Sequence, residues 1–333
     1  SWHVLGDILP KQFPISLSPF VSHEYILKEK FFLILNNLIN SKPDCILAVG
    51  GGKLVDAGKC IAHRLNCQVV IIPTLASNDA PCSSISVLYT ADGVKDVVEY
   101  FPQNPAFVIV DTEVIVNASE RYLVAGMGDA MATWYEARVC EDNPITSNLV
   151  GCRPTLAASA LSEKCAQTLF EHGVAAADNV RNNKNSDSVE KVVEANTLLS
   201  GIGFESGGLA LAHPLANSYT EITRLNKKYL HGEMVAMGTL AQLAMESSKD
   251  LEKVTKFFID VGLPVNLEQL SMSPLQKSEI DIVIETAFKN PLIKNMNFEV
   301  SKELILDSIK KADEVGTHFV RKYGDEAYRR LHS

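Results

Sequence analysis

Three groups of residues in this sequence could carry chemistry, and the first is a glycine run. Gly50-Gly51-Gly52-Lys53 directly follows the apolar run 46–49. Backbone N–H groups in such a run can approach a pyrophosphate closely, and the N-terminus of a following helix favours the negative charge. The spacing matches neither the G-x-G-x-x-G fingerprint nor a P-loop. Phosphate binding and a simple tight turn therefore both remain open interpretations.

The second group is the polar segment 74–84, which follows the apolar run 68–72. It combines several hydroxyl groups with the amide of Asn78 and the carboxylate of Asp79. Ligands of open α/β sheets bind at the carboxyl ends of strands, which is where this segment would lie. Polar residues are also common in ordinary turns, so a set of turns is the other interpretation.

The third group consists of Asp129, His213 and His231. One carboxylate and two imidazoles suit zinc or ferrous iron and leave a coordination position open for a substrate. The two histidines are 18 residues apart, so they cannot form the i, i+4 pair of an H-E-x-x-H helix and must converge through the fold. We expect the other six histidines at the surface: His3, His23, His63, His172, His318 and His332.

The elements that would position these groups differ between the two halves of the chain. Apolar runs at 46–49, 68–72 and 107–111 predict buried strands, with a helix over 54–63 between the first two. Asp92-Gly93 separates the runs 85–90 and 94–100, which indicates a β-hairpin.

Helical periodicity begins at about residue 119. We predict an exposed loop over 181–188 and helices over five segments: 125–140, 154–173 with Gly173 at its end, 188–206, 231–246 and 304–320.

These patterns predict two domains. The first is an α/β nucleotide-binding domain over residues 1–118, with a parallel, Rossmann-like sheet and a β-hairpin. The second is an all-α metal- and substrate-binding domain over residues 119–333. In the first 40 residues, Val4–Asp7 could end a strand and Phe31–Ile39 could form a helix, but no full strand-helix-strand unit fits between them.

Composition excludes several classes of protein. The 333 residues are 46% hydrophobic and 21% charged, which is typical of a globular protein. The formal net charge of -9 disfavours nucleic acid and anionic membranes as partners. The seven cysteines contain no C-x-x-C pair, which indicates reduced thiols. We find no apolar run long enough for a membrane span and no signal peptide, and we expect a cytoplasmic protein.

Several segments together resemble the glycerol dehydrogenase family, one of the metal-dependent polyol and alcohol dehydrogenases related to dehydroquinate synthase. The resemblance spans about residues 44–320. The segments that carry it are Gly50-Gly51-Gly52-Lys53 with Asp56 and Lys59, then 73–89, 124–138, 193–213, 231–240 and Asn295-Met296-Asn297-Phe298.

The resemblance implies a role for each candidate residue. Asp129, His213 and His231 would be the metal ligands, for Zn²⁺ or Fe²⁺, and Asp79 would complete the catalytic set by hydrogen-bonding substrate hydroxyls. Asp7 would contact the adenosine ribose of NAD. The other residues implied to contact NAD are Gly51, Gly52, Lys53, Thr74, Ser77, Ser83, Ile85 and Tyr89.

The implied activity is hydride transfer from glycerol, or a related vicinal diol, to NAD, which gives dihydroxyacetone. A divalent metal lowers the pKa of the substrate hydroxyl, so no separate strong base is required. The alternatives are a glycerol-1-phosphate dehydrogenase and an NAD-using cyclase (a lyase) similar to dehydroquinate synthase. The cyclase would need several Lys and Arg residues around its phosphate and carboxylate, and no such cluster flanks Asp129 or His213. The resemblance also implies a homo-oligomer.

Two features depart from the family. Where the family usually reads His-Ala-Ile-His-Asn-Gly, this chain has His213-Pro214-Leu215-Ala216-Asn217-Ser218. The second histidine is replaced by Ala216, which bears on substrate preference but not on the three implied ligands. The region around Asp7 is also shorter than the strand and helix of the family, which affects the adenosine side of the implied site.

Overall fold

A small parallel sheet begins the described part of the chain. The computed structural model describes residues 42–89 and 95–333. Strands β1 (Cys45–Gly50), β2 (Gln68–Pro73) and β5 (Phe107–Val108) are parallel and lie in the order β1-β2-β5. Helix α3 (Gly52–Leu65) connects β1 to β2 and packs Val55 against Ala48 and Ile71 of the strands. The predicted parallel α/β region is confirmed.

A β-hairpin follows the sheet, as predicted. Strands β3 (Ile85–Tyr89) and β4 (Lys95–Tyr100) are antiparallel, with an irregularity in register between Leu88 and Tyr89. The predicted Asp92-Gly93 turn lies outside the described residues. The hydroxyl of Ser86 donates to the backbone oxygen of Asp56 at 3.1 Å, which fixes the hairpin to α3.

The third strand is shorter than the run 107–111 predicts. β5 ends at Val108, and Asp111 is instead the N-cap of helix α4 (Thr112–Val116), where its side chain accepts a hydrogen bond from the Glu113 N–H. An aspartate satisfies the free N–H groups of a helix start well, so the local capping preference ends the strand early.

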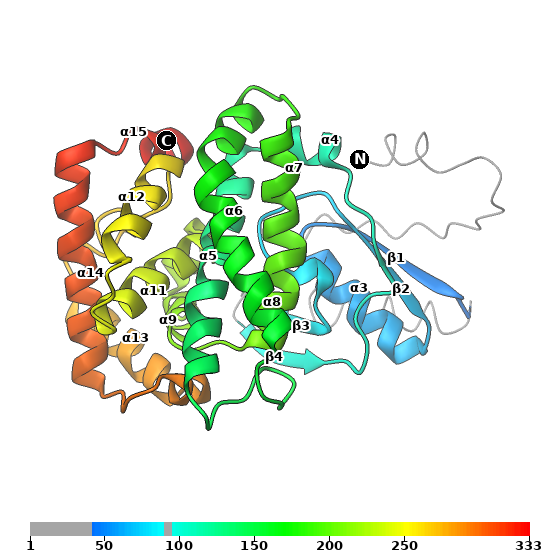
Figure 1. Ribbon diagram of the computed structural model, residues 1–333, viewed down its shortest axis with the longest axis horizontal. Helices are drawn as coiled ribbons and strands as arrows, with labels where there is room; N and C mark the ends of the chain where they lie inside the picture. Colours follow the sequence, from blue (N-terminus) through cyan, green and yellow to red (C-terminus); the bar gives the residue numbers. More distant parts are fainter. Residues whose placement is uncertain (1–41, 90–94) are drawn as a thin grey trace.

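The rest of the described chain is helical, apart from the loops between helices. The longer helices are α5 (Glu120–Asp142), α6 (Leu156–Arg181), α7 (Asp187–Glu194), α8 (Ser200–Gly207), α9 (Ala212–Thr220), α11 (His231–Met245), α12 (Leu251–Val261), α13 (Lys277–Lys289) and α14 (Lys302–Tyr323). The shorter ones are α10 (Thr223–Lys228), α15 (Glu326–His332) and the 3₁₀ turns Ala80–Cys82 and Pro291–Asn295. In Figure 1, α5, α6 and α7 stand between the sheet and helices α12 to α14.

Helix α6 continues past the glycine that we predicted to end it. Gly173 lies inside α6, which extends to Arg181. A Cβ atom at Gly173 would lie 2.8 Å from the ring of Phe257, so this glycine lets α12 pack closely against α6. The glycine at position 173 is therefore explained by the packing of two helices and not by the end of a helix.

The predicted helix over 188–206 is continuous but contains a π-helical segment, Ala195–Leu199, between α7 and α8. Such a segment inserts an extra residue into the helix and changes which side chains share a face. Both Asn196 and Ser200 are fully buried there and reach the loop that carries Asp79, as described below.

One large apolar core joins the helices, and it includes side chains from α5, α6, α9, α11, α12, α13 and α14. The predicted surface position of His332 is wrong, because its side chain is only 5% exposed and its Nε2 lies 3.0 Å from Glu233 Oε1. Within residues 42–89 and 95–333, no helix has the length and apolar character needed to cross a bilayer.

Helices α5 and α11 cross at a contact made by two glycines. A Cβ atom at Gly232 would overlap the backbone oxygen of Ala125, and one at Gly128 would overlap the backbone oxygen of Gly232. The backbones can approach this closely only because both residues lack a side chain. This crossing places Asp129 next to His231.

The Gly232→Ala variant tests this crossing. The added methyl group meets backbone atoms, which cannot rotate away, so we expect the free energy of unfolding to fall by at least about 1–3 kcal/mol. Urea unfolding of the two proteins measures the change. The Gly207→Ala variant should lose less, because its new atom would lie 2.9 Å from the Ala137 Cβ, a smaller overlap than that with the Ala125 oxygen at Gly232. Equal stability of Gly232→Ala and the unchanged protein would contradict the close backbone contact.

Candidate functional site

The glycine run and the polar loop begin at the same edge of the sheet. Gly50 pairs with Pro73 in the β1-β2 register, and the Thr74 N–H donates to the Gly50 oxygen at 3.1 Å. Both segments therefore leave the carboxyl ends of adjacent parallel strands, where open α/β sheets bind ligands. The structure brings the first two predicted groups together.

The glycine run forms the start of α3. Gly51 is the N-cap, and no side chain caps the helix there. Within this first turn, the Leu54 N–H donates to the Gly51 oxygen at 2.9 Å. A Cβ atom at Gly52 would overlap the side-chain amide of Asn78, so the polar loop packs directly on this helix start. Partial burial lowers the pKa of the adjacent Lys53.

A buried lysine holds the polar loop through hydrogen bonds to its backbone. Lys59 of α3 is 3% exposed, and its Nζ donates to the backbone oxygens of Ala80 at 2.9 Å and Ser83 at 3.3 Å, and to that of Ile85. Its charge is paired with Asp56 at 3.3 Å. A buried ammonium group needs such partners, and here they fix the path of the loop.

Asp79 links this loop to the helical region. Its carboxylate Oδ2 accepts a hydrogen bond from the Ser200 hydroxyl at 3.1 Å, and its backbone N–H lies 3.3 Å from Asp129 Oδ2. The middle of the loop therefore lies directly beside the third predicted group.

Asp129, His213 and His231 converge although they come from three different helices. Each offers one ligand atom, and these atoms lie within 4.8 Å of one another. The Nε2 atoms of both histidines are 3.4 Å from Asp129 Oδ1. Asp129 and His213 are buried, whereas 39% of the His231 side chain is exposed. The convergence that we predicted is present.

The distances and the donor set fit a divalent metal. Asp129 Oδ1 is buried and accepts no hydrogen bond from the described residues. Zinc bonds of about 2.05 Å in tetrahedral geometry separate the ligand atoms by about 3.3 Å, close to the two distances found here. A metal ion would satisfy this buried carboxylate oxygen, which has no hydrogen-bond donor and lies between two imidazole nitrogens.

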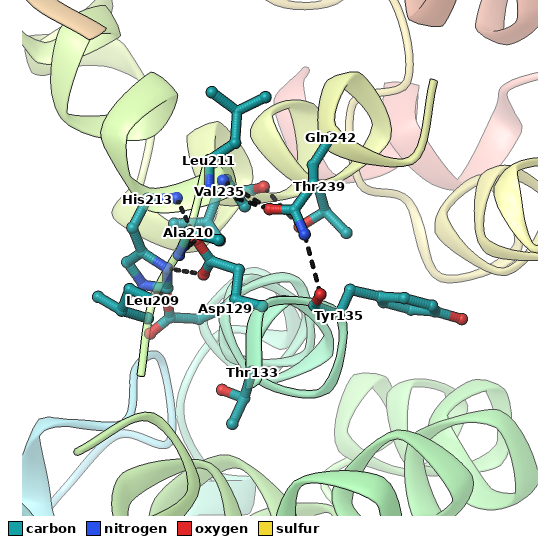
Figure 2. A network of polar contacts seen from close by, with 12 residues as sticks. Asp129, Thr133, Tyr135, Leu209, Ala210, Leu211, His213, Val235, Thr239 and Gln242 are labelled. Atoms are coloured by element: carbon teal, nitrogen blue, oxygen red, sulfur yellow. Dashed lines mark hydrogen bonds and ion pairs between the residues drawn. The ribbon is translucent and has the colours of Figure 1, made fainter. Parts of the chain in front are cut away.

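Glu136 fixes the orientation of His213. Its Oε2 lies 2.5 Å from His213 Nδ1, while its Oε1 accepts hydrogen bonds from the backbone N–H groups of Ala210 and His213 at 2.8 and 3.1 Å. Figure 2 shows the segment from Leu209 to His213 beside α5 in this network. A carboxylate on Nδ1 leaves Nε2 free to face a metal.

The buried groups of the site shift one another's pKa values. Burial and the neighbouring Asp129 raise the pKa of Asp79 well above its usual range. Burial alone would also raise the pKa of Asp129, but His231 and His213 lower it. Burial alone would lower the pKa of His213, but Glu136 and Asp129 raise it well above its usual range. Asp129 is therefore held in the ionised form that a metal ligand requires.

The remaining residues that were predicted to contact NAD differ in how deeply they are buried. Thr74 and Ser77 are half-buried in the polar loop, whereas Ser83 and Ile85 are buried beside Lys59. Asp7 and the side chain of Tyr89 lie outside what the structure describes.

Sequence reasoning assigned no role to Glu136, Lys59 or Ser200. Glu136 lies seven residues after Asp129, which is two helical turns, so both project from one face of α5. That spacing could have indicated that Glu136 lies near Asp129. Nothing near Ser200 in the sequence indicates that it reaches Asp79, 121 residues away.

The sequence matches the family described as iron-containing alcohol dehydrogenase over residues 31–112. The chain is 42% identical to glycerol dehydrogenase of Thermotoga maritima, over 85% of this chain and 78% of that protein. It is also 42% identical to glycerol dehydrogenase of Escherichia coli O6:H1, over 84% of this chain and 76% of that protein.

The fold is similar to that of a solved structure, a probable glycerol dehydrogenase of Sinorhizobium meliloti 1021. The TM-score is 0.84 at 34% sequence identity, and the similarity covers 89% of this chain and 84% of that one. The predicted fold class is therefore confirmed.

Metal binding should stabilise the protein measurably. Zinc at about 100 times its dissociation constant should raise the free energy of unfolding by about 2.7 kcal/mol, because it binds the folded triad only. Thermal melts with zinc and with a chelator measure this difference. Asp129→Asn should abolish the zinc-dependent rise in Tm, and an undiminished rise in that variant would place the metal elsewhere.

The Glu136→Gln variant should weaken zinc binding by about 10- to 100-fold, because it removes the carboxylate that orients His213. Competition with a chromophoric chelator measures the affinity. Glu120→Gln is the matched control, since Glu120 is a buried carboxylate of the same helix that pairs with Arg330 at 2.9 Å instead. Equal zinc affinities for Glu136→Gln and the control would refute the orienting role.

Proposed function

Because the chain belongs to the glycerol dehydrogenases of the iron-containing alcohol dehydrogenase family, we propose that it oxidises glycerol, or a related vicinal diol, with NAD in a metal-dependent reaction. The product from glycerol is dihydroxyacetone. The observation that carries the proposal is the buried Asp129 Oδ1, which accepts no hydrogen bond from the described residues and lies 3.4 Å from the Nε2 atoms of His213 and His231.

In this proposal, Asp129, His213 and His231 hold the metal. When bound, the metal supplies a Lewis acid that makes a substrate hydroxyl acidic near neutral pH, and the nicotinamide supplies the hydride acceptor. Zn²⁺ is the proposed ion, and Fe²⁺ suits the same ligand set. Glu136 keeps Nε2 of His213 directed at the site through its 2.5 Å contact with Nδ1.

Asp79 is proposed to bind a substrate hydroxyl. It is buried, it lies beside Asp129, and it comes from the loop at the carboxyl edge of the sheet. In the position of the second family histidine, Ala216 is fully buried in the helical core. Pro214 is also buried in the first turn of α9, where a proline is tolerated. Substrate selection is therefore proposed to depend on Asp79 rather than on residue 216.

The nucleotide is proposed to bind along the edge where β1 and β2 end. The uncapped start of α3 at Gly51 and Gly52 would receive the pyrophosphate, with Lys53 beside it. Further contacts are proposed from Thr74, Ser77, Ser83, Ile85 and Tyr89, and from Asp7 at the adenosine ribose.

Several broader predictions accompany this function. A homo-oligomer follows from the family resemblance, and a cytoplasmic location follows from the scattered cysteines. We also propose that the domains divide at residues 118 and 119, between the last residues of α4 and the Ser119 cap of α5.

The test is the initial rate of NADH formation from glycerol by metal-stripped protein, with and without added zinc. We expect turnover that depends on zinc and that Asp129→Asn removes, because this variant lacks a ligand charge. Glu120→Gln again serves as the control and should keep its activity.

No turnover of glycerol in the presence of zinc and NAD would refute glycerol as the substrate. Glycerol 1-phosphate is then the informative second substrate, since turnover only with the phosphate would identify the alternative dehydrogenase. Conversion of a phosphorylated sugar acid without net NADH formation would identify the cyclase.

A further inference from the structure

The π-helical segment and the start of α8 contact the Asp79 loop at three places. The side-chain amide of Asn196 donates to the Ala76 oxygen at 2.9 Å, and the Ser200 hydroxyl donates to Asp79 Oδ2 at 3.1 Å. A Cβ atom at Gly201 would lie 2.9 Å from the Asp79 oxygen, so the loop backbone rests on the helix there. The position of the Asp79 carboxylate is therefore set by this part of the helical region.

The orientation of the Ser200 hydroxyl is itself fixed. Its Oγ lies 2.7 Å from Thr133 Oγ1, and both residues are fully buried. A hydroxyl has one proton, so when Ser200 donates to Asp79 its oxygen accepts from Thr133. Figure 2 shows Thr133 on the opposite side of α5 from His213.

The two carboxylate oxygens of Asp79 have different surroundings. Oδ2 receives the Ser200 hydrogen bond. Of the described residues, Ser200 is the side chain that hydrogen-bonds this carboxylate, and it does so at Oδ2 rather than Oδ1. The residue is 8% exposed and its backbone N–H contacts Asp129, so the carboxylate lies next to the metal triad without belonging to it. A carboxylate oxygen in such a place accepts best from a ligand hydroxyl.

We propose that Ser200, oriented by Thr133, is a positioning residue that holds Asp79 Oδ1 toward the second hydroxyl of a polyol substrate. In this way Ser200 determines the preference for vicinal diols over monoalcohols. The inference rests on the proposed function and deepens it, because the reacting hydroxyl is assigned to the metal triad and the neighbouring hydroxyl to Asp79.

The experiment compares two substrates that differ by one hydroxyl. Propane-1,2-diol and propan-2-ol are both oxidised at their second carbon, but only the diol carries a neighbouring hydroxyl. We expect Ser200→Ala in the zinc-loaded protein to lower kcat/KM for the diol about tenfold, as for the loss of one buried hydrogen bond. The value for propan-2-ol should change less than twofold. If propan-2-ol is not oxidised, its inhibition constant against the diol gives the same comparison.

Two further variants separate positioning from a structural role. Thr133→Val keeps the shape of the residue but removes its hydroxyl, so it should shift the diol preference in the same direction by a smaller factor. Ser308→Ala is the matched control, because Ser308 is a buried helical serine whose hydroxyl donates to the Ile305 oxygen at 2.8 Å, far along the chain in α14. It should leave the preference unchanged.

Equal losses with the diol and the monoalcohol in Ser200→Ala would overturn the proposal, and so would a loss of bound zinc or a lowered Tm that accounts for the lower rate. Measurements on the unchanged protein show whether the proposed function itself fails. If it oxidises neither glycerol nor the diol with zinc and NAD present, the proposed function falls, and this inference falls with it.

Discussion

The buried carboxylate of Asp129 needs positively charged or hydrogen-bonding partners, and the packing of the helical region brings them to it. A charge removed from water without partners is strongly unfavourable, and Oδ1 of this residue accepts no hydrogen bond from the described chain. Two imidazole nitrogens approach it instead, each at 3.4 Å. One approach depends on the crossing of α5 and α11 at Gly128 and Gly232, and the other depends on Glu136, which holds the ring of His213. The packing of these helices therefore determines the geometry of the site.

Sequence patterns predicted the elements whose signals are local. The apolar runs before Gly50 and Pro73 became adjacent parallel strands, and the periodic segments became α5, α11 and α14 with ends near those expected. The polar loop was placed correctly at the edge of the sheet because strand order alone fixes which ends meet. The convergence of Asp129 with two histidines was expected from the donor types and from the family resemblance, since the spacing along the chain is too long to indicate it.

Most of the errors and omissions share a physical cause, because they depend on a partner far away in the sequence. Gly173 resembles a helix end until Phe257 packs against it, and His332 resembles a surface residue until Glu233 is found beside it. The early end of the strand predicted over 107–111 is the exception, because Asp111 caps the adjacent helix α4. The contact of Ser200 with Asp79 spans 121 residues and has no periodic signature at all.

The polar loop that carries Asp79 is held from two sides. Lys59 bonds its backbone from the sheet region, while Asn196, Ser200 and Glu205 bond it from the helical region, the last through the N–H and the hydroxyl of Ser84 at 2.5 and 3.0 Å. A hybrid enzyme that joins the first 118 residues of one relative to the helices of another would therefore inherit a loop shaped for the wrong support. Exchange of the first 118 residues between members of this family requires the loop-contacting residues of the π-helical segment Ala195–Leu199 and of α8 to be transferred with them.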